Sequence, residues 1–141
     1  MILSIELDLP PALNKAYRAS VSRNGRPYTY KTTEAKRWQR ESQLIINASR
    51  KVKETEESPV GVNVKLFLSR DRDIDSSFKL LLDTLENAGV IKNDRQIGQL
   101  NAQKHSKGEC KWCNLHHEFE RDKVIVDVFS MDSTFRSRKK A

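Results

Sequence analysis

The chain has 141 residues, of which 26 are Lys or Arg and 19 are Asp or Glu, so its formal net charge at pH 7 is +7. This length supports one domain with a hydrophobic core and is too short for two. We expect no signal peptide, because the apolar segment Met1–Ile5 is too short and too uncharged for one. We also expect no membrane-spanning helix, because no apolar run approaches the roughly 18 residues that a span needs. The basic excess favours a polyanion such as nucleic acid as the partner.

The first part of the chain contains a predicted strand and a long basic loop. Apolar and polar residues alternate over residues 2–9, a pattern typical of a half-buried strand, and Pro10 ends it. Residues 12–31 lack a regular apolar period and are rich in Arg, Asn, Ser and Tyr. The pair Asn24-Gly25 favours a tight turn, so we expect a hairpin within this loop.

A helix is predicted next, with Thr32 or Thr33 as its cap and an end near Arg50. Apolar residues recur within it at close to the spacing of one helical face. The residues expected on that buried face are Ala35, Trp38, Ile45 and Ala48.

The second half predicts a strand, a helix and two further strands. Valine and leucine alternate over residues 60–68 and indicate a central strand. Apolar residues over 78–88 recur at helical spacing, with Gly89 as the stop signal. Residues 97–102 and 123–131 have strand patterns. Together these elements predict an α/β or α+β domain with a small mixed sheet and two main helices.

A cluster of aspartates lies between the predicted central strand and the second helix. Asp71, Asp73 and Asp75 alternate, so they share one face if the strand continues through them, and Lys79 follows in the first helical turn. Such carboxylates can hold a hard cation such as Mg²⁺, which keeps water positions open for a phosphate. The alternative is that Asp75 or Ser76 caps the helix while the other acids are solvated.

Asp94 is a further candidate carboxylate, and it follows the second helix within Asn93-Asp94-Arg95. A helix and a turn would return it beside the strand end that carries Asp73. The alternative is an ordinary turn, in which Asn and Asp are common.

The segment between Asn14 and Lys53 is strongly basic, since its only acids are Glu34 and Glu41. Its basic residues are interleaved with tyrosines, an arrangement suited to phosphate contacts and to the stacking of unpaired bases. The alternative is a solvated basic loop. The candidate DNA-contacting residues are Lys15, Tyr17, Arg18, Arg23, Arg26 and Lys31, with Lys36, Arg37 and Arg40 extending the patch along the helix.

All cysteines and histidines of the chain lie within residues 105–117. The two cysteines have the spacing of a zinc knuckle, and histidines on either side can complete four ligands. The alternative is a polar hairpin with two free thiols. Two cysteines do not form a disulfide framework, so we expect a reducing compartment. The expected ligand set is His105, Cys110, Cys113 and His116, with His117 as the alternative to His116.

Two segments resemble signatures of the RusA-type crossover junction endodeoxyribonucleases. The first is Leu9-Pro10-Pro11-x-x-Asn14-Lys15-x-Tyr17-Arg18. The second is Asp73-Ile74-Asp75-Ser76-Ser77-Phe78-Lys79, followed by Asp94 after Leu85-x-x-Ala88-Gly89. The resemblance spans about residues 4–105, and the joint match in the right order is more specific than either segment alone.

The resemblance implies a homodimeric enzyme that uses Mg²⁺, or Mn²⁺ in its place, to resolve Holliday junctions by paired nicks during DNA recombination and repair. It implies that Asp73, Asp75 and Asp94 hold the metal and that Lys79 is the catalytic lysine. Asn14 joins the candidate DNA contacts through the first signature. The chain departs from the family at Ser76, where the family usually has Asn, and this change can lower or alter the activity.

On this basis we expect residues 1–132 to form one RusA-like nuclease domain, with a Cys/His-containing insert at 105–121 and a disordered basic tail at 133–141. The expected location is the cytoplasm of a bacterium, with the chain encoded by the bacterium or by a phage. Two alternatives remain. One is a nucleic-acid-binding protein without enzymatic activity, and the other is a metal nuclease that acts on other branched DNA.

Overall fold

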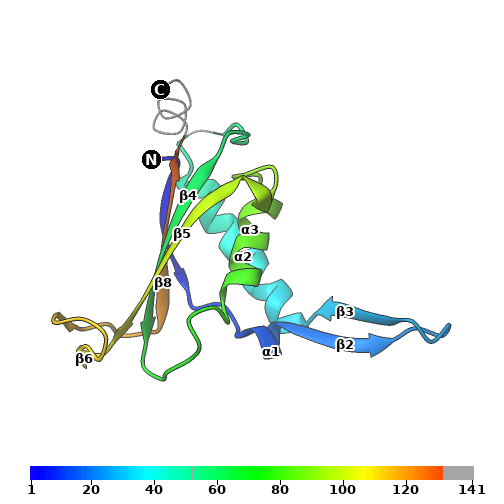
Figure 1. Cartoon of the computed structure of the whole chain (residues 1–141), viewed down its shortest axis with the longest axis horizontal. Helices are drawn as coiled ribbons and strands as arrows, with labels where there is room; N and C mark the ends of the chain where they lie inside the picture. Colours follow the sequence, from blue (N-terminus) through cyan, green and yellow to red (C-terminus); the bar gives the residue numbers. More distant parts are fainter. Residues whose placement is uncertain (52, 132–141) are drawn as a thin grey trace.

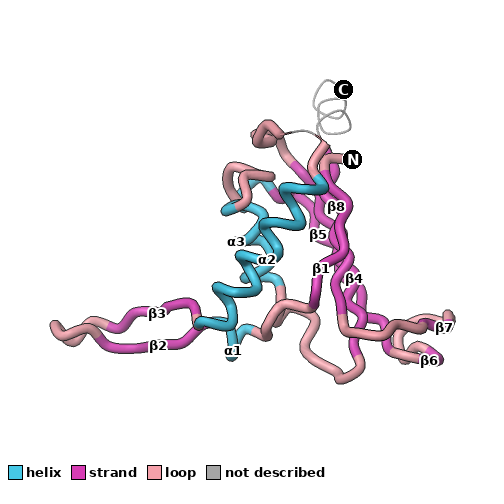
Figure 2. The backbone as a smooth tube through the Cα atoms, turned by 180° about the vertical axis from the view of Figure 1, so that it is seen from behind, coloured by secondary structure: helices cyan, strands magenta, loops and turns pink. Residues whose placement is uncertain are grey.

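The computed structural model describes residues 1–51 and 53–131 of the chain. Its centre is a four-stranded sheet with two long helices on one face (Figures 1 and 2). The expected mixed α+β class is confirmed, while the expected basic tail at 133–141 lies outside the described residues. The strands are β1 (Leu3–Asp8), β4 (Val60–Leu68), β5 (Ile97–Ser106) and β8 (Lys123–Ser130), and the helices are α2 (Thr33–Ser49) and α3 (Phe78–Asn87).

The sheet is mixed, with the strand order β1-β8-β4-β5. β8 is antiparallel to both of its neighbours, β1 and β4, whereas β4 and β5 are parallel. The parallel pair runs from Val60 opposite Ile97 to Leu68 opposite Ser106, and its register shifts once, between Val60 and Gly61. β4 is therefore a central strand, as its alternating valines and leucines predict.

The hydrophobic core lies between the sheet and the two helices. Alternate residues of β4, from Val60 to Leu68, are buried because successive side chains of a strand point to opposite faces. Leu81 and Leu85 of α3 are fully buried against this face. The opposite face of the sheet carries polar contacts instead, such as the hydrogen bond that Asn101 donates to Asn63.

The buried face of α2 differs from the expected one. Thr32 caps the helix as predicted, because its hydroxyl accepts a hydrogen bond from the Ala35 N–H. Ile45 and Ala48, however, are exposed, and Ile46 is fully buried in their place. The buried positions follow the helical spacing i, i+3, i+4, i+7, but some of them are polar residues. A search for apolar residues alone therefore misses part of this face. The buried residues of α2 are Ala35, Trp38, Gln39, Ser42 and Ile46.

The ends of α3 agree only in part with the sequence. Ser77 occupies the N-cap position rather than Asp75 or Ser76, and its side chain makes no capping hydrogen bond. Ser77 is instead fully buried, and its hydroxyl accepts a hydrogen bond from the Arg72 guanidinium. At the other end, Gly89 follows the helix with φ of 77°, as its predicted role as a stop signal requires.

Two small hairpins project from this body. α1 (Leu13–Ala16) leads into β2 (Tyr17–Val21), which pairs with β3 (Pro27–Lys31) to form the arm. The predicted turn lies at its tip, where Gly25 has φ of 77°. β6 (Gly108–Glu109) and β7 (His116–His117) form the second hairpin, and a 3₁₀ helix, η1 (Asp94–Gln96), precedes β5. None of the described helices is long and apolar enough to cross a membrane.

Three functional candidates leave the sheet at the same edge. The ends of β1, β4 and β5 lie together, because Asp8 pairs with Lys123, Lys123 with Phe67, and Phe67 with His105. The arm follows β1, the acidic loop (residues 69–77) follows β4, and the hairpin of β6 and β7 follows β5 (Figure 1). The fold thus gathers the basic, acidic and Cys/His segments at one end of the molecule.

Candidate functional site

The acidic loop is held in place by contacts of its backbone and of one arginine. The Arg72 guanidinium donates to the Pro10 carbonyl at 2.7 Å and to the Ser77 hydroxyl at 2.8 Å. The Ser76 hydroxyl donates to the Asp73 carbonyl at 2.9 Å. The loop is therefore fixed through groups other than the carboxylates of Asp73 and Asp75, both of which are exposed.

Asp73 and Asp75 also differ from most other aspartates in having no partner for their carboxylates. Within the described residues, neither carboxylate forms a hydrogen bond or an ion pair. Carboxylates of this kind are the ligands that a hard divalent cation takes, one or two at a time, alongside several waters. The paired aspartates are Asp8 with Arg121, Asp71 with Lys104, Asp83 with Lys31, Asp122 with Ser69, and Asp127 with Ser4.

Asp94 does not lie beside Asp73, where the sequence predicts it. Asp94 is the first residue of η1, and η1 ends directly before Ile97. Ile97 in turn pairs with Val60 at the start of β4. Asp73 instead follows the other end of β4. The expected return beside Asp73 is wrong within one chain, because α3 runs back along β4 and delivers Asp94 to the opposite end of the sheet (Figure 1).

The Asp94 carboxylate shares one property with Asp73 and Asp75. It too forms no hydrogen bond or ion pair within residues 1–51 and 53–131. Asn93 supplies the local cap instead, accepting a hydrogen bond from the Arg95 N–H at 2.9 Å. Asp94 is thus presented at the surface by a turn that does not use its side chain.

Lys79 lies in the first turn of α3, beside the base of the arm. Its ammonium is 4.3 Å from the centre of the Tyr17 ring, a distance at which a cation and an aromatic face attract. Tyr17 is half-buried, and burial, followed by the charge of Asp83, raises the pKa of its hydroxyl. Asp83 in turn pairs with Lys31 at 2.5 Å. Lys79 therefore stands at the junction of α3, the arm and the acidic loop.

The arm presents a basic and aromatic face. Arg18 lies opposite Tyr30, and Ser20 lies opposite Tyr28, so these four side chains share one side of the two-stranded ribbon. Both tyrosines are exposed, with ring centres 6.0 Å apart. Tyr17 and Lys31 differ from the other candidates, since their contacts build the base of the arm. The exposed candidates are Asn14, Lys15, Arg18, Arg23, Arg26, Lys36, Arg37 and Arg40.

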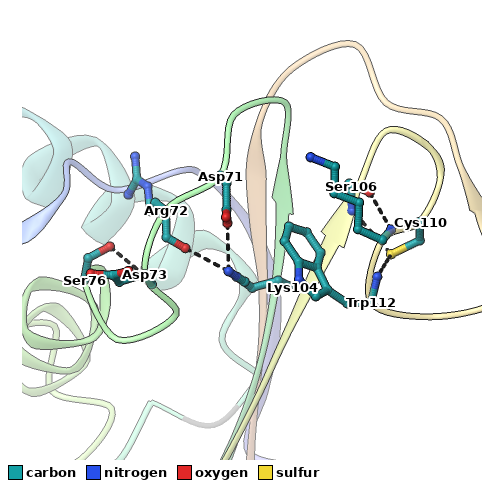
Figure 3. A network of polar contacts seen from close by, with 9 residues as sticks. Asp71, Arg72, Asp73, Ser76, Lys104, Ser106, Cys110 and Trp112 are labelled. Atoms are coloured by element: carbon teal, nitrogen blue, oxygen red, sulfur yellow. Dashed lines mark hydrogen bonds and ion pairs between the residues drawn. The ribbon is translucent and has the colours of Figure 1, made fainter.

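Lys104 of β5 connects the acidic loop with the Cys/His hairpin (residues 105–117), a role that no local sequence pattern indicates. Its ammonium donates to the Asp71 carboxylate at 2.7 Å and to the Arg72 carbonyl at 3.1 Å (Figure 3). The same ammonium lies 4.4 Å from the Trp112 ring centre. The hydrogen bond from Lys104 lowers the pKa of Asp71. The strand predicted at residues 97–102 ends before Lys104, whereas β5 continues to Ser106 and carries this lysine to the acidic loop.

The Cys/His hairpin brings four potential ligands together. The ligand atoms of His105, Cys110, Cys113 and His117 all lie within 4.8 Å of one another. His116 is not among them. Neighbouring residues of a strand point to opposite sides, so His116 points away from the side of β7 on which His117 lies. Its Nε2 lies 2.7 Å from Oε1 of Glu118. Of the two histidines that the sequence offers as the fourth ligand, the structure brings His117 into the cluster and not His116.

Cys110 has an environment that favours its thiolate. Its sulfur accepts hydrogen bonds from the backbone N–H groups of Ser106 and Trp112, both at 3.4 Å. Desolvation opposes ionisation, but these bonds and those from Cys113 and His105 lower the pKa of Cys110 to about 5. A thiolate is the form of cysteine that binds metals.

Comparison with known protein families shows which family the chain belongs to. The family described as Endodeoxyribonuclease RusA matches residues 10–112, a range that runs from the arm through α2, β4, the acidic loop and α3 to Trp112 of the Cys/His hairpin. A search of curated proteins found no significant match. The match covers well over half of the chain and contains the acidic loop and the basic arm. The chain therefore belongs to the RusA family of endodeoxyribonucleases.

Proposed function

We propose that this protein is a Mg²⁺-dependent endonuclease that resolves four-way DNA junctions by paired, symmetric nicks. One observation carries the proposal. In a chain of the RusA family, Asp73 and Asp75 follow β4 at the same edge of the sheet as the basic arm, and their carboxylates have no partner in the described part of the chain. A metal site and a DNA-binding element that share one edge can act on the same phosphodiester bond.

In this proposal Asp73 and Asp75 hold the metal, and Lys79 acts beside it. A bound Mg²⁺ supplies an activated water and neutralises charge on the phosphate. Lys79, in the adjacent first turn of α3, places a positive charge where negative charge develops on the leaving oxygen. The Tyr17 ring beneath its ammonium limits the positions that this long side chain adopts.

The arm is the proposed DNA-binding element. Arginines at 18, 23 and 26 are exposed along the ribbon and suit contacts with phosphates. Tyr28 and Tyr30 offer exposed rings on the same face as Arg18, and such rings can stack on bases that are unpaired at the crossover. The α2 residues Lys36, Arg37 and Arg40 would extend this surface.

In a homodimer, Asp94 of one protomer could complete the metal site of the other, although it cannot reach the site of its own chain. Asp94 lies at the opposite end of β4 from Asp73, yet its carboxylate is also without a partner in the described residues. In a two-fold dimer, the partner's Asp94 can approach the acidic loop of the first protomer, and the arrangement repeats at the second site. Two matched sites would then face the two symmetric strands of a four-way junction.

The nuclease domain is assigned to residues 1–132, with the insert at 105–121. Ser76 replaces the Asn that the family usually carries after its second aspartate. Here the Ser76 hydroxyl donates to the Asp73 carbonyl and so supports the turn that presents Asp73. We infer that Ser76 preserves the loop conformation and contributes no metal ligand.

Cleavage of end-labelled DNA tests the proposal. A four-way junction, a flap and a linear duplex are each incubated with the protein in Mg²⁺ and in chelator. Selective cutting of the junction in Mg²⁺ is expected. Preferred cutting of the flap would identify a nuclease for other branched DNA, and junction binding without cutting of any substrate would identify a non-enzymatic DNA-binding protein.

A further inference from the structure

The Cys/His hairpin contains a four-ligand arrangement apart from the acidic loop. His105 comes from the end of β5, Cys110 and Cys113 from the turn, and His117 from β7. Gly108, with φ of 76°, allows the chain to reverse between them. Four ligand atoms from three elements thus converge within 4.8 Å of one another.

The distances suit a tetrahedral metal ion. The Cys113 sulfur lies 3.6 Å from His105 Nδ1 and 3.2 Å from His117 Nε2. Zinc bonds of about 2.3 Å to sulfur and about 2.0 Å to nitrogen, at tetrahedral angles, place such atoms about 3.6 Å apart. The two distances from Cys113 therefore match those expected around zinc, and the other ligand atoms lie within 4.8 Å of one another.

The surroundings support the ligands as a metal site requires. The two backbone N–H groups that donate to the Cys110 sulfur stabilise a thiolate. On the other side, the Phe67 ring packs 5.1 Å from the His105 ring and 5.7 Å from the His117 ring, measured between ring centres. This apolar wall orients both imidazoles and excludes water from one side of the site.

We propose that His105, Cys110, Cys113 and His117 bind one structural Zn²⁺. Two thiolates and two imidazoles form a closed tetrahedral set, which is typical of structural rather than catalytic zinc. Mixed sulfur and nitrogen ligands disfavour Mg²⁺ and Ca²⁺, which prefer oxygen. The site is therefore separate in chemistry from the one proposed at Asp73.

The zinc would hold a hairpin that steadies the acidic loop. Trp112 lies between the two cysteines, and its ring covers the Lys104 ammonium. That ammonium binds the Asp71 carboxylate and the Arg72 carbonyl, directly before Asp73 (Figure 3). The metal thus fixes a turn whose tryptophan, through Lys104, positions the carboxylate loop; this second step rests on the proposed nuclease function.

The test is metal analysis of protein purified without chelator. Wild-type protein is expected to contain about one zinc ion per chain. Exchange with Co²⁺ should give the visible absorption of tetrahedral cobalt and a near-ultraviolet band from thiolate ligands. A wild-type protein without zinc, which takes up Co²⁺ without these bands, would overturn the proposal.

The two adjacent histidines provide a matched pair of variants. His117→Ala should lose most of the zinc, whereas His116→Ala should keep it, because His116 faces Glu118 instead. Loss of zinc in His116→Ala with retention in His117→Ala would refute the ligand set. Thermal unfolding of both variants shows whether a loss of zinc reflects global unfolding, and the cobalt spectrum of the wild type tests the site without any substitution.

Trp112→Ala tests the connection to the acidic loop. It should keep about one zinc, because Trp112 is not a ligand, but it should slow Mg²⁺-dependent cleavage. Unchanged cleavage would refute the connection and leave the zinc site intact. Zinc in a wild-type protein that cuts no DNA would instead refute the nuclease function, so the two failures are distinguishable.

Discussion

At the scale of single residues, the carboxylates of Asp73 and Asp75 are set apart because neither has a partner among residues 1–51 and 53–131. Like charges in a short loop repel one another unless a cation lies between them. Their loop is nevertheless fixed by the contacts of Arg72 and Ser76 rather than by the carboxylates. The fold therefore presents two charges that are available to a metal.

We expect Asp73→Asn and Asp75→Asn to abolish cleavage while junction binding persists or tightens slightly. Each change removes a metal ligand but also removes a negative charge that repels DNA. Cleavage and gel-shift assays on the same junction measure both effects. Asp8→Asn is the control, since it changes the same charge at the same edge of the sheet. Wild-type cleavage by both loop variants would exclude the metal assignment.

Lys79→Ala should slow cleavage much more than it weakens binding. One lysine among many adds little to polyanion affinity, whereas loss of a positioned charge can lower the rate on the order of 100-fold. Single-turnover cleavage and the dissociation constant separate the two quantities. Lys36→Ala, an exposed lysine on α2, should affect binding alone. Equal losses of rate and binding in Lys79→Ala would make it an ordinary phosphate contact.

The sequence located some of these residues and missed others for a physical reason. Asp73, Asp75 and Lys79 are close in the chain, so local spacing reveals them. Lys104 acts through Asp71 and Trp112, which are brought to it by strand pairing and by a hairpin. Likewise, the choice between His116 and His117 depends on which face of β7 each occupies. Contacts between distant segments are not encoded in local patterns.

At the scale of elements, the arm is held to the body at its base and is exposed along its length. Lys31 pairs with Asp83 of α3, and Tyr17 packs beneath Lys79. Beyond that base, no residue from 18 to 30 is buried. The arginines and tyrosines of this ribbon do not stabilise a core, so they remain available to contact a binding partner such as DNA.

Replacing Arg18, Arg23 and Arg26 with Gln should weaken junction binding and flatten its salt dependence. Each lost phosphate contact lowers the slope of log affinity against log salt by about 0.9 for duplex DNA. Binding titrations over a range of salt concentrations give this slope. Lys31→Gln is the control, because Lys31 is held in an ion pair with Asp83. This change should lower the free energy of unfolding by at most about 1 kcal/mol and leave the salt slope unchanged. An unchanged slope in the triple variant would move the DNA surface away from the arm.

Elements with a strong apolar period were predictable, and irregular ones were not. β4 matched its prediction because alternating valines and leucines in a central strand leave little ambiguity. The buried face of α2 was misjudged because Gln39 and Ser42 lie within it, where Gln39 donates to Thr84 at 2.9 Å. The short strands β6 and β7 have no apolar period, so their pairing depends on the turn between them.

At the scale of the whole molecule, the position of Asp94 is the reason for proposing a composite site. The topology of β4, α3 and β5 separates Asp94 from Asp73 by the length of a strand. The sequence could not reveal this separation, since it depends on the direction of α3 relative to the sheet. In the proposed dimer, each site would take Asp94 from the partner subunit, which would bring together the three carboxylates that the family resemblance implies.

Mixing two inactive variants tests that arrangement. In a heterodimer of Asp73→Asn and Asp94→Asn subunits, one composite site carries both changes and the other carries neither. Activity should therefore reappear, as single nicks, although each homodimer is inactive. The pair Asp73→Asn and Asp75→Asn is the matched control, because both changes lie on the same loop and each site keeps one of them. No recovery in the first mixture, from heterodimers isolated with two affinity tags, would place Asp94 outside a shared site.

The most direct measurement is cleavage of a supercoiled plasmid that extrudes a cruciform, which is a four-way junction. In Mg²⁺ the wild-type protein should convert it to linear DNA, since paired nicks across the junction release both strands. Chelator should prevent the cleavage, and a plasmid of the same length without the cruciform should stay intact. Equal cleavage of both plasmids, or junction binding with no cleavage in Mg²⁺, would contradict the account.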